Sequence, residues 1–152
     1  MATNLTPSLN VLGPFSVSFW LKTDGLNAVS QTFLLNKGTY PTFGWDVLDD
    51  GPFQPYVIFR VYPSTNEVVF DRALANDGGW HHIAGTYDGA MLIFYLDGLP
   101  IASNDAGTYA PDTTTAFFIG KSSPNGDGGL LDQIRFYARG LTPGEVACLA
   151  AE

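Results

Sequence analysis

Two Asp-Gly pairs, Asp88-Gly89 and Asp97-Gly98, divide the segment 80–103 into three apolar runs. The runs are residues 80–87, 91–96 and 99–103. Asp-Gly between apolar runs is the strongest short-range hairpin signal, because both residues tolerate the positive φ angles of a tight hairpin turn. The segment is therefore predicted to be a three-stranded antiparallel meander.

The run 15–21 alternates strictly between apolar and mostly polar residues, which is the period-two pattern of a half-buried strand. One face would carry Phe15, Val17, Phe19 and Leu21, and the other Ser16, Ser18 and Trp20. Further strands are predicted at 33–37, 43–48, 56–62, 67–71, 116–120 and 130–138.

A short helix is predicted over 143–150, since Thr142 and Glu145 have capping-box spacing and Pro143 takes the first helical position. Val146 and Leu149 would then face a sheet, and Cys148 is expected to be a small buried thiol. About ten short antiparallel strands in 152 residues predict one all-β domain over 1–152, a two-sheet antiparallel β-sandwich with a short C-terminal helix.

Composition excludes several classes of protein. Charged residues make up 14% and aromatic residues 14% of the chain, which is not the composition of a disordered protein. The net charge of −8 would repel a phosphate backbone, so no nucleic-acid partner is expected. No apolar run is long enough to span a bilayer, and the first 21 residues lack the basic residue of a secretory signal. Neither membrane insertion nor a signal peptide is therefore expected.

Six motifs occur in order along most of the chain. They are FSVSFWLK (15–22), LLNKG (34–38), GWHHIAGTYDG (79–89), FYLDGLPIA (94–102), FFIG (117–120) and LLDQIRFYARGLTPGEV (130–146). This set resembles the laminin G-like, or pentraxin-like, branch of the concanavalin A-like lectin and glucanase superfamily. The resemblance implies a jelly-roll with one sheet curved to give a concave face. It also implies a lectin, an adhesion or carbohydrate-binding module, or an appendage of a viral or cell-surface protein.

Catalysis by a carboxylate pair is not expected. Glucanases of this superfamily place two acids on one strand face, because one attacks or stabilises while the other donates a proton. The chain has three glutamates, Glu67, Glu145 and Glu152, and none has an acid two residues away. His81 and His82 are neighbours on one strand and point to opposite faces, so they cannot share a site. We therefore expect no enzyme activity and two structural histidines.

Aromatic residues are the candidates for ligand binding. A sugar presents an apolar face that stacks on aromatic rings, and exposed rings also suit protein partners. The candidate glycan- or partner-binding residues are Tyr40, Phe43, Trp45, Tyr56, Tyr62 and Tyr109. Burial in the core is the alternative for each of these rings.

No cofactor is required, although calcium is a candidate ligand. Asn125, Asp127 and Asp132 surround a Gly-rich turn and supply the oxygen atoms that calcium prefers. The alternative is that these residues simply form turns. Lys121, Ser122 and Ser123 stand where pentraxin-like relatives carry the acids and amides of their paired calcium site, so that site is not carried over.

Two functions remain open. The first is a non-catalytic binding or adhesion module of the laminin G-like type that recognises glycans through aromatic residues on loops or on the concave sheet. The second is a structural virion-surface protein, such as a phage capsid decoration, fibre or tail component. Such a protein would form a homo-oligomer, for example a trimer, or dock on a larger shell. Both functions place the protein outside the cell or on a virion surface.

Overall fold

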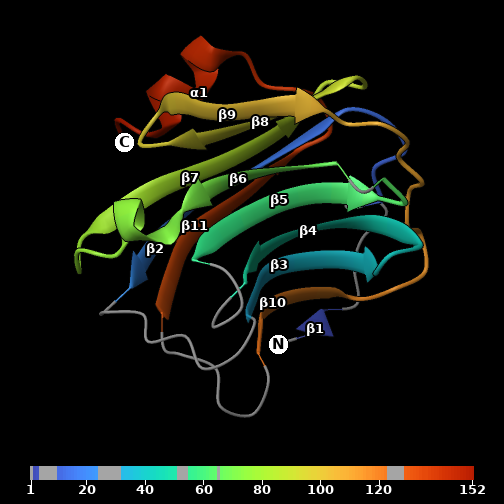
Figure 1. Ribbon diagram of the computed structural model, residues 1–152, viewed down its shortest axis with the longest axis horizontal. Helices are drawn as coiled ribbons and strands as arrows, with labels where there is room; N and C mark the ends of the chain where they lie inside the picture. Colours follow the sequence, from blue (N-terminus) through green and yellow to red (C-terminus); the bar gives the residue numbers. More distant parts are fainter. Residues whose placement is uncertain (1, 4–9, 24–31, 51–54, 65, 123–128) are drawn as a thin grey trace.

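The computed structural model describes residues 2–3, 10–23, 32–50, 55–64, 66–122 and 129–152, which form a sandwich of two antiparallel sheets (Figure 1). The six-stranded sheet contains, from edge to edge, β1 (Ala2–Thr3), β10 (Phe117–Ser122), β3 (Thr32–Thr39), β4 (Phe43–Asp49), β5 (Tyr56–Tyr62) and β6 (Glu67–Asp71). The five-stranded sheet contains β11 (Gly129–Tyr137), β2 (Phe15–Thr23), β7 (Trp80–Tyr87), β8 (Met91–Leu96) and β9 (Leu99–Asp105). The predicted two-sheet sandwich is confirmed.

The meander predicted over 80–103 is present as β7, β8 and β9, and its two turns differ. Asp97 and Gly98 both have positive φ angles, 50° and 81°, as a two-residue hairpin turn requires. In the first turn Gly89 has the positive φ angle, and the Asp88 carboxylate instead accepts hydrogen bonds from the backbone of Ala90 and Met91. This turn is therefore longer than the two-residue turn that the sequence predicts.

Aromatic side chains from both sheets fill the core between them. The apolar face of β2 is buried as predicted, with Phe15, Val17 and Phe19 fully inaccessible. The Phe15 ring lies 5.3 Å from the Trp45 ring and 5.8 Å from the Phe136 ring, measured between centroids. Burying large rings removes more apolar area from water than any other side chain does, so this contact set stabilises the sandwich.

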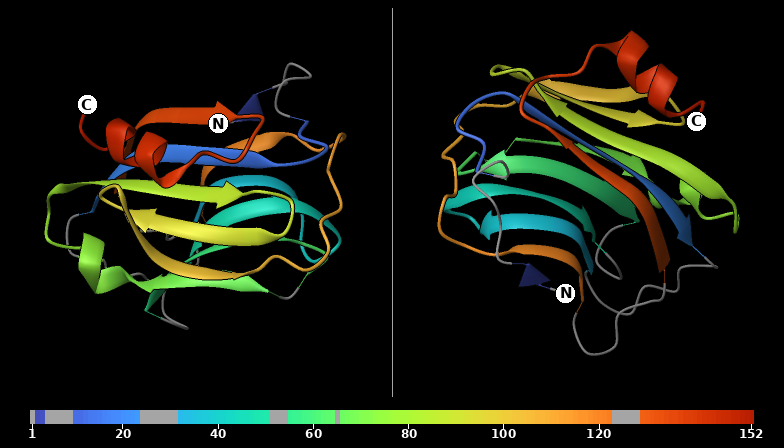
Figure 2. Two further views of the ribbon diagram at one scale, coloured as in Figure 1. Left: turned by 90° about the horizontal axis from the view of Figure 1, so that it is seen from above. Right: turned by 180° about the vertical axis from the view of Figure 1, so that it is seen from behind.

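Helix α1 (Pro143–Leu149) packs on the outer face of the five-stranded sheet (Figure 2). The predicted capping box is present, because Thr142 and Glu145 each accept a hydrogen bond from the backbone N–H of the other. Val146 is fully buried in a small cluster with Ala84 and Tyr95. The prediction for Cys148 is wrong: its thiol is exposed, because two helical residues beyond Val146 amounts to about 200° around the helix axis.

Candidate functional site

A row of polar residues crosses the outer face of the six-stranded sheet. Asn36 of β3, Asp46 of β4, Arg60 of β5 and Glu67 of β6 lie directly opposite one another in the strand registers. Neighbours of Asp46 and Arg60 along the strands, such as Trp45 and Phe59, belong to the core. Because successive side chains on a strand point to opposite faces, the polar row faces away from the other sheet.

Asp46 is the centre of this row and is fully inaccessible to solvent. Its two carboxylate oxygens accept hydrogen bonds from Arg60, with Nε–Oδ1 and Nη2–Oδ2 distances of 3.0 and 3.3 Å. The Tyr62 hydroxyl donates to the same carboxylate. Burial raises the pKa of Asp46 above its usual value, against the opposing effects of Arg60 and Tyr62, and burial beside Asp46 also raises the pKa of Tyr62. The Asp46 carboxylate therefore holds the Arg60 guanidinium and the Tyr62 ring in place through these hydrogen bonds.

Tyr40 lies above this cluster and is 63% exposed. The Arg60 guanidinium carbon is 4.9 Å from the centre of the Tyr40 ring, and the Tyr62 ring meets it edge-on at 5.4 Å. A cation over an aromatic face and an edge-on ring pair are both attractive. The exposed Tyr40 ring is therefore held in a fixed orientation by two neighbours that Asp46 positions. We call Tyr40, Asp46, Arg60, Tyr62 and Glu67 the Tyr40 cluster.

The hairpin that presents Tyr40 depends on two glycines. Gly38 and Gly44 lie opposite each other at the ends of β3 and β4, with φ angles of 144° and 95°. A Cβ atom at Gly44 would stand 2.0 Å from the Lys37 carbonyl oxygen, so no larger residue fits there. This close approach fixes the turn that carries Tyr40 between the two strands.

The other aromatic candidates lie elsewhere. Trp45 is 1% exposed in the core, so its ring has no face open to a sugar, and its candidacy as a ligand-binding residue is corrected on that ground. Tyr56 is 37% exposed but stands opposite Asp71 at the other end of β5. Phe43 is half-buried at the start of β4. The structure thus brings together Tyr40 and Tyr62, and leaves Tyr56, Trp45 and Phe43 outside the cluster. Tyr62 is 0% exposed, so like Trp45 it has no ring face open to a sugar, and its role is to support Tyr40.

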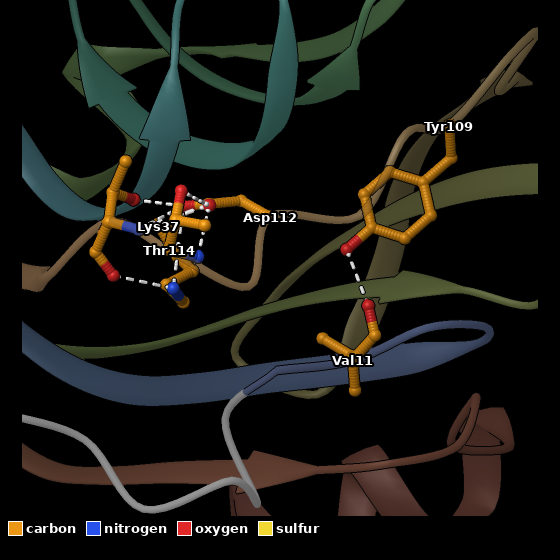
Figure 3. Close-up of polar contacts among 6 residues, drawn as sticks. Val11, Lys37, Tyr109, Asp112 and Thr114 are labelled. Atoms are coloured by element: carbon orange, nitrogen blue, oxygen red, sulfur yellow. Dashed lines mark hydrogen bonds and ion pairs between the residues drawn. The ribbon is translucent and has the colours of Figure 1, made fainter.

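Tyr109 is half-buried and has a structural role (Figure 3). Its hydroxyl donates to the Val11 carbonyl at 3.0 Å, and its ring packs on Phe15 and Tyr87. Burial raises the pKa of its hydroxyl. These contacts close one end of the sandwich rather than present a ring to solvent.

Figure 3 also shows a buried ion pair that sequence reasoning did not identify, between Lys37 and Asp112. The side chains are 3% and 1% exposed, and the Nζ–Oδ2 distance is 3.4 Å. Burial raises the pKa of Asp112, but hydrogen bonds from Thr115 and Thr114 outweigh it and lower the pKa to about 2. Lys37 also donates to the Thr115 carbonyl, so the pair ties the segment before β10 to β3.

The calcium candidates are only partly described. Asn125 and Asp127 lie outside the described residues, whereas Asp132 is exposed and accepts a hydrogen bond from the Gln133 backbone at 2.7 Å. Across the part of the chain that the structure describes, no three His, Cys, Asp or Glu side chains come together as metal ligands. Calcium binding at this turn therefore stays a hypothesis.

The two histidines face different surroundings, as their opposite orientations predict. His81 lies between two carboxylates, with Nδ1 2.9 Å from Asp97 and Nε2 3.0 Å from Asp77. Desolvation lowers the pKa of His81, but the hydrogen bonds to Asp97 and Asp77 outweigh it and raise the pKa above its usual value. Burial instead lowers the pKa of His82, which is 2% exposed.

These shifts predict a pH-dependent contribution from His81. A raised pKa in the folded state stabilises the protein below the unfolded-state pKa of about 6.5, and the effect is lost as pH rises through the folded-state value. His81→Gln should therefore cost more stability at pH 5.5 than at pH 8.5, measured by urea unfolding of both proteins. His82 acts in the opposite sense, because its lowered pKa makes the fold less stable below pH 6.5, so the comparison must be with wild type at each pH. An equal cost at both pH values would contradict the expectation.

Comparisons with known proteins agree with this architecture. The family model described as "Concanavalin A-like lectin/glucanases superfamily" matches residues 2–147. A search of curated proteins finds no match. Within the described residues, no helix is long and apolar enough to cross a membrane.

Three solved structures with this fold are binding domains. The binding domain of botulinum neurotoxin DC in complex with SialylT has a TM-score of 0.74 and 14% identity, covering 96% of this chain and 37% of that one. The same domain in complex with rat synaptotagmin II has a TM-score of 0.72 and 14% identity, and the match covers 93% of this chain and 36% of that one. The binding domain of Paraclostridial Mosquitocidal Protein 1 has a TM-score of 0.73 and 18% identity, and the match covers 98% of this chain and 39% of that one. The chain thus spans little more than a third of each neighbour, and the likeness shows the fold alone.

Proposed function

The chain belongs to the concanavalin A-like lectin/glucanase superfamily, and we propose that it is a non-catalytic binding module that recognises a neutral saccharide through the Tyr40 cluster. The observation that carries the proposal is the exposed Tyr40 ring, held in place by Arg60 and Tyr62. A pyranose ring stacks its apolar face on such a ring without ordering it first, so less entropy is lost on binding.

Polar groups beside the ring suit sugar hydroxyls. The Arg60 side chain is 17% exposed and can donate hydrogen bonds, and the Glu67 side chain is 40% exposed and can accept them. Fixed donors and acceptors around an apolar surface give a binding site its orientation and specificity. The cluster has both on one side of Tyr40.

The charge of the cluster favours a neutral ligand. Asp46 and Glu67 carry two negative charges against the single positive charge of Arg60, within a chain of net charge −8. An acidic sugar would meet repulsion here, whereas a neutral sugar would not. Asp46 itself does not serve as a catalytic acid, because its buried carboxylate is bonded to Arg60 and Tyr62.

A protein partner is the second candidate, favoured by an exposed Tyr beside a partly exposed Arg, since both residue types are enriched at interface hot spots. The solved neighbours include a complex with a protein, rat synaptotagmin II, as well as one with SialylT. A role outside the cell suits either partner. The virion-surface role stays a hypothesis, and these comparisons do not support it.

Tyr40→Ala is expected to abolish saccharide binding while leaving the fold intact. In a screen of neutral oligosaccharides, the affinity of a ligand that binds wild type should fall at least about tenfold, equivalent to about 1.4 kcal/mol. Because Tyr40 is exposed, its loss should change the free energy of unfolding by less than about 1 kcal/mol.

Tyr56→Ala is the matched control, since it removes an exposed tyrosine from the far end of β5. Its affinity should equal that of wild type. A screen in which no neutral saccharide binds, or in which Tyr40→Ala binds as well as wild type, would exclude the proposal. A captured protein whose binding Tyr40→Ala abolishes would favour the second candidate instead.

A further inference from the structure

Lys22 stands apart from the other cationic side chains that the structure describes. Lys37 and the four arginines form ion pairs: Lys37 with Asp112, Arg60 with Asp46, Arg72 with Asp49, Arg135 with Glu152 and Arg139 with Glu145. Lys22 has no carboxylate partner among the described residues. In a chain with 7 basic and 15 acidic residues, a cation with no carboxylate partner among the described residues is an unusual feature.

Exposed apolar side chains flank Lys22 on both sides. Leu130 of β11 and Trp80 of β7 lie directly opposite Lys22 in the strand registers, and they are 59% and 43% exposed. In β2 the neighbouring residue Leu21 belongs to the core, so these three side chains lie on the outer face of the five-stranded sheet. Trp20 follows on the same face and packs edge-on against His82 at 5.4 Å. We call Trp20, Lys22, Trp80 and Leu130 the Lys22 patch.

Part of this sheet face is covered by the chain itself. Helix α1 packs over Ala84 and Tyr95, and the Arg135–Glu152 ion pair at 2.5 Å brings the last residue of the chain onto β11 (Figure 2). His82, which lies opposite Trp20, is already buried. Among the described residues, the Lys22 patch lies outside this covered part of the face, as do the exposed side chains of Met91 and Ile101.

We propose that the Lys22 patch binds an acidic saccharide, a sugar whose ring carries a carboxylate. Its apolar ring face would stack on Trp80 and Leu130, and its carboxylate would pair with the Lys22 ammonium. Because Lys22 has no carboxylate partner among the described residues, its ammonium favours an anionic ligand, and the flanking apolar side chains favour an anion that also has an apolar face. The net charge of −8 disfavours long polyanions such as nucleic acids.

This inference stands apart from the proposed function. The Lys22 patch and the Tyr40 cluster lie on the outer faces of different sheets, so a ligand on one leaves the other open. The two surfaces also differ in charge, which predicts different ligands. One molecule would then bind a neutral and an acidic saccharide at the same time.

The test is titration of the whole chain with three acidic probes: trigalacturonate, a hyaluronan hexasaccharide and 3′-sialyllactose. Fully methyl-esterified trigalacturonate serves as the uncharged control ligand. At least one acidic probe should bind, the ester should bind more weakly than the acid, and affinity should fall as salt rises. Trp80→Ala should weaken binding at least about tenfold, and Lys22→Gln about three- to tenfold with a flatter salt dependence.

Two control variants separate this site from others. Leu99→Ala removes an exposed apolar side chain elsewhere, and Tyr40→Ala removes the neutral-saccharide site; both should bind the acidic probe as wild type does. Failure of all three probes to bind, or wild-type binding by Lys22→Gln and Trp80→Ala, would overturn the inference. A concentration-dependent dimer that Trp80→Ala abolishes would also overturn it, since the patch would then be a contact between two copies.

Discussion

Replacing Arg60 with alanine is expected to destabilise the fold by about 3 kcal/mol. The reason is Asp46, whose carboxylate is fully buried and would lose the guanidinium that compensates its charge. Removing one partner of a buried ion pair leaves an unpaired charge in a poorly solvated place, which costs more than the intact pair contributes. The value lies at the lower end of the usual range because the Arg60 side chain is 17% exposed.

Replacing both partners should cost much less. In the double variant Asp46→Asn with Arg60→Met, no charge is buried and the long side chain still covers the sheet, so most of the lost stability should return. Urea unfolding of wild type, the single variants Asp46→Asn and Arg60→Met, and the double variant gives the coupling free energy directly. If Arg60→Ala unfolds at the wild-type urea midpoint, the carboxylate is not buried as described.

The same variants test how the Tyr40 cluster is built. The double variant is expected to fold yet bind the neutral saccharide weakly, because the Tyr40 ring loses the cation beneath it. Tyr40→Ala should lose binding without losing stability. The variants thus distinguish two roles. Asp46 acts by positioning Arg60, whereas Tyr40 acts by direct contact with the saccharide.

The strands were predictable because their signals are local. Strands β5, β6, β7 and β8 begin and end where the apolar runs do, and the capping box of α1 is readable from Thr142 and Glu145. The sandwich follows from these elements and from the motifs of the family. Cys148 was misplaced because its apolar neighbours suggest burial, whereas the helical period turns it to solvent.

The Tyr40 cluster was only partly predictable, because it depends on register. Alternation along β4 shows that Trp45 and Val47 share one face and Asp46 takes the other, but it does not say which face is the core. Asp46 and Arg60 are 14 residues apart and meet only because β4 and β5 pair at that register. Tyr40 and Tyr62 were both named as candidates, yet no local pattern links them.

Replacing Trp45 with alanine is expected to cost about 3–5 kcal/mol of stability, the usual range for removing a large aromatic ring from a core. Its ring lies 5.3 to 5.9 Å from the rings of Phe15, Phe136 and Phe117, and these would line the resulting cavity. Strands from both sheets contribute to that contact, so the loss would weaken the whole sandwich. Urea unfolding monitored by circular dichroism measures it.

Trp45→Phe separates packing from hydrogen bonding at the same position. The Trp45 indole nitrogen is buried and has no hydrogen-bond partner among the described residues, so the change to phenylalanine removes an unsatisfied donor. The smaller ring keeps most of the contacts, and the cost should stay below about 1.5 kcal/mol. Both variants, where folded, should bind the neutral saccharide with wild-type affinity, because Trp45 and Tyr40 lie on opposite faces of the sheet. Loss of binding by a folded Trp45→Phe protein at unchanged stability would return Trp45 to the ligand-binding residues and contradict its place in the core.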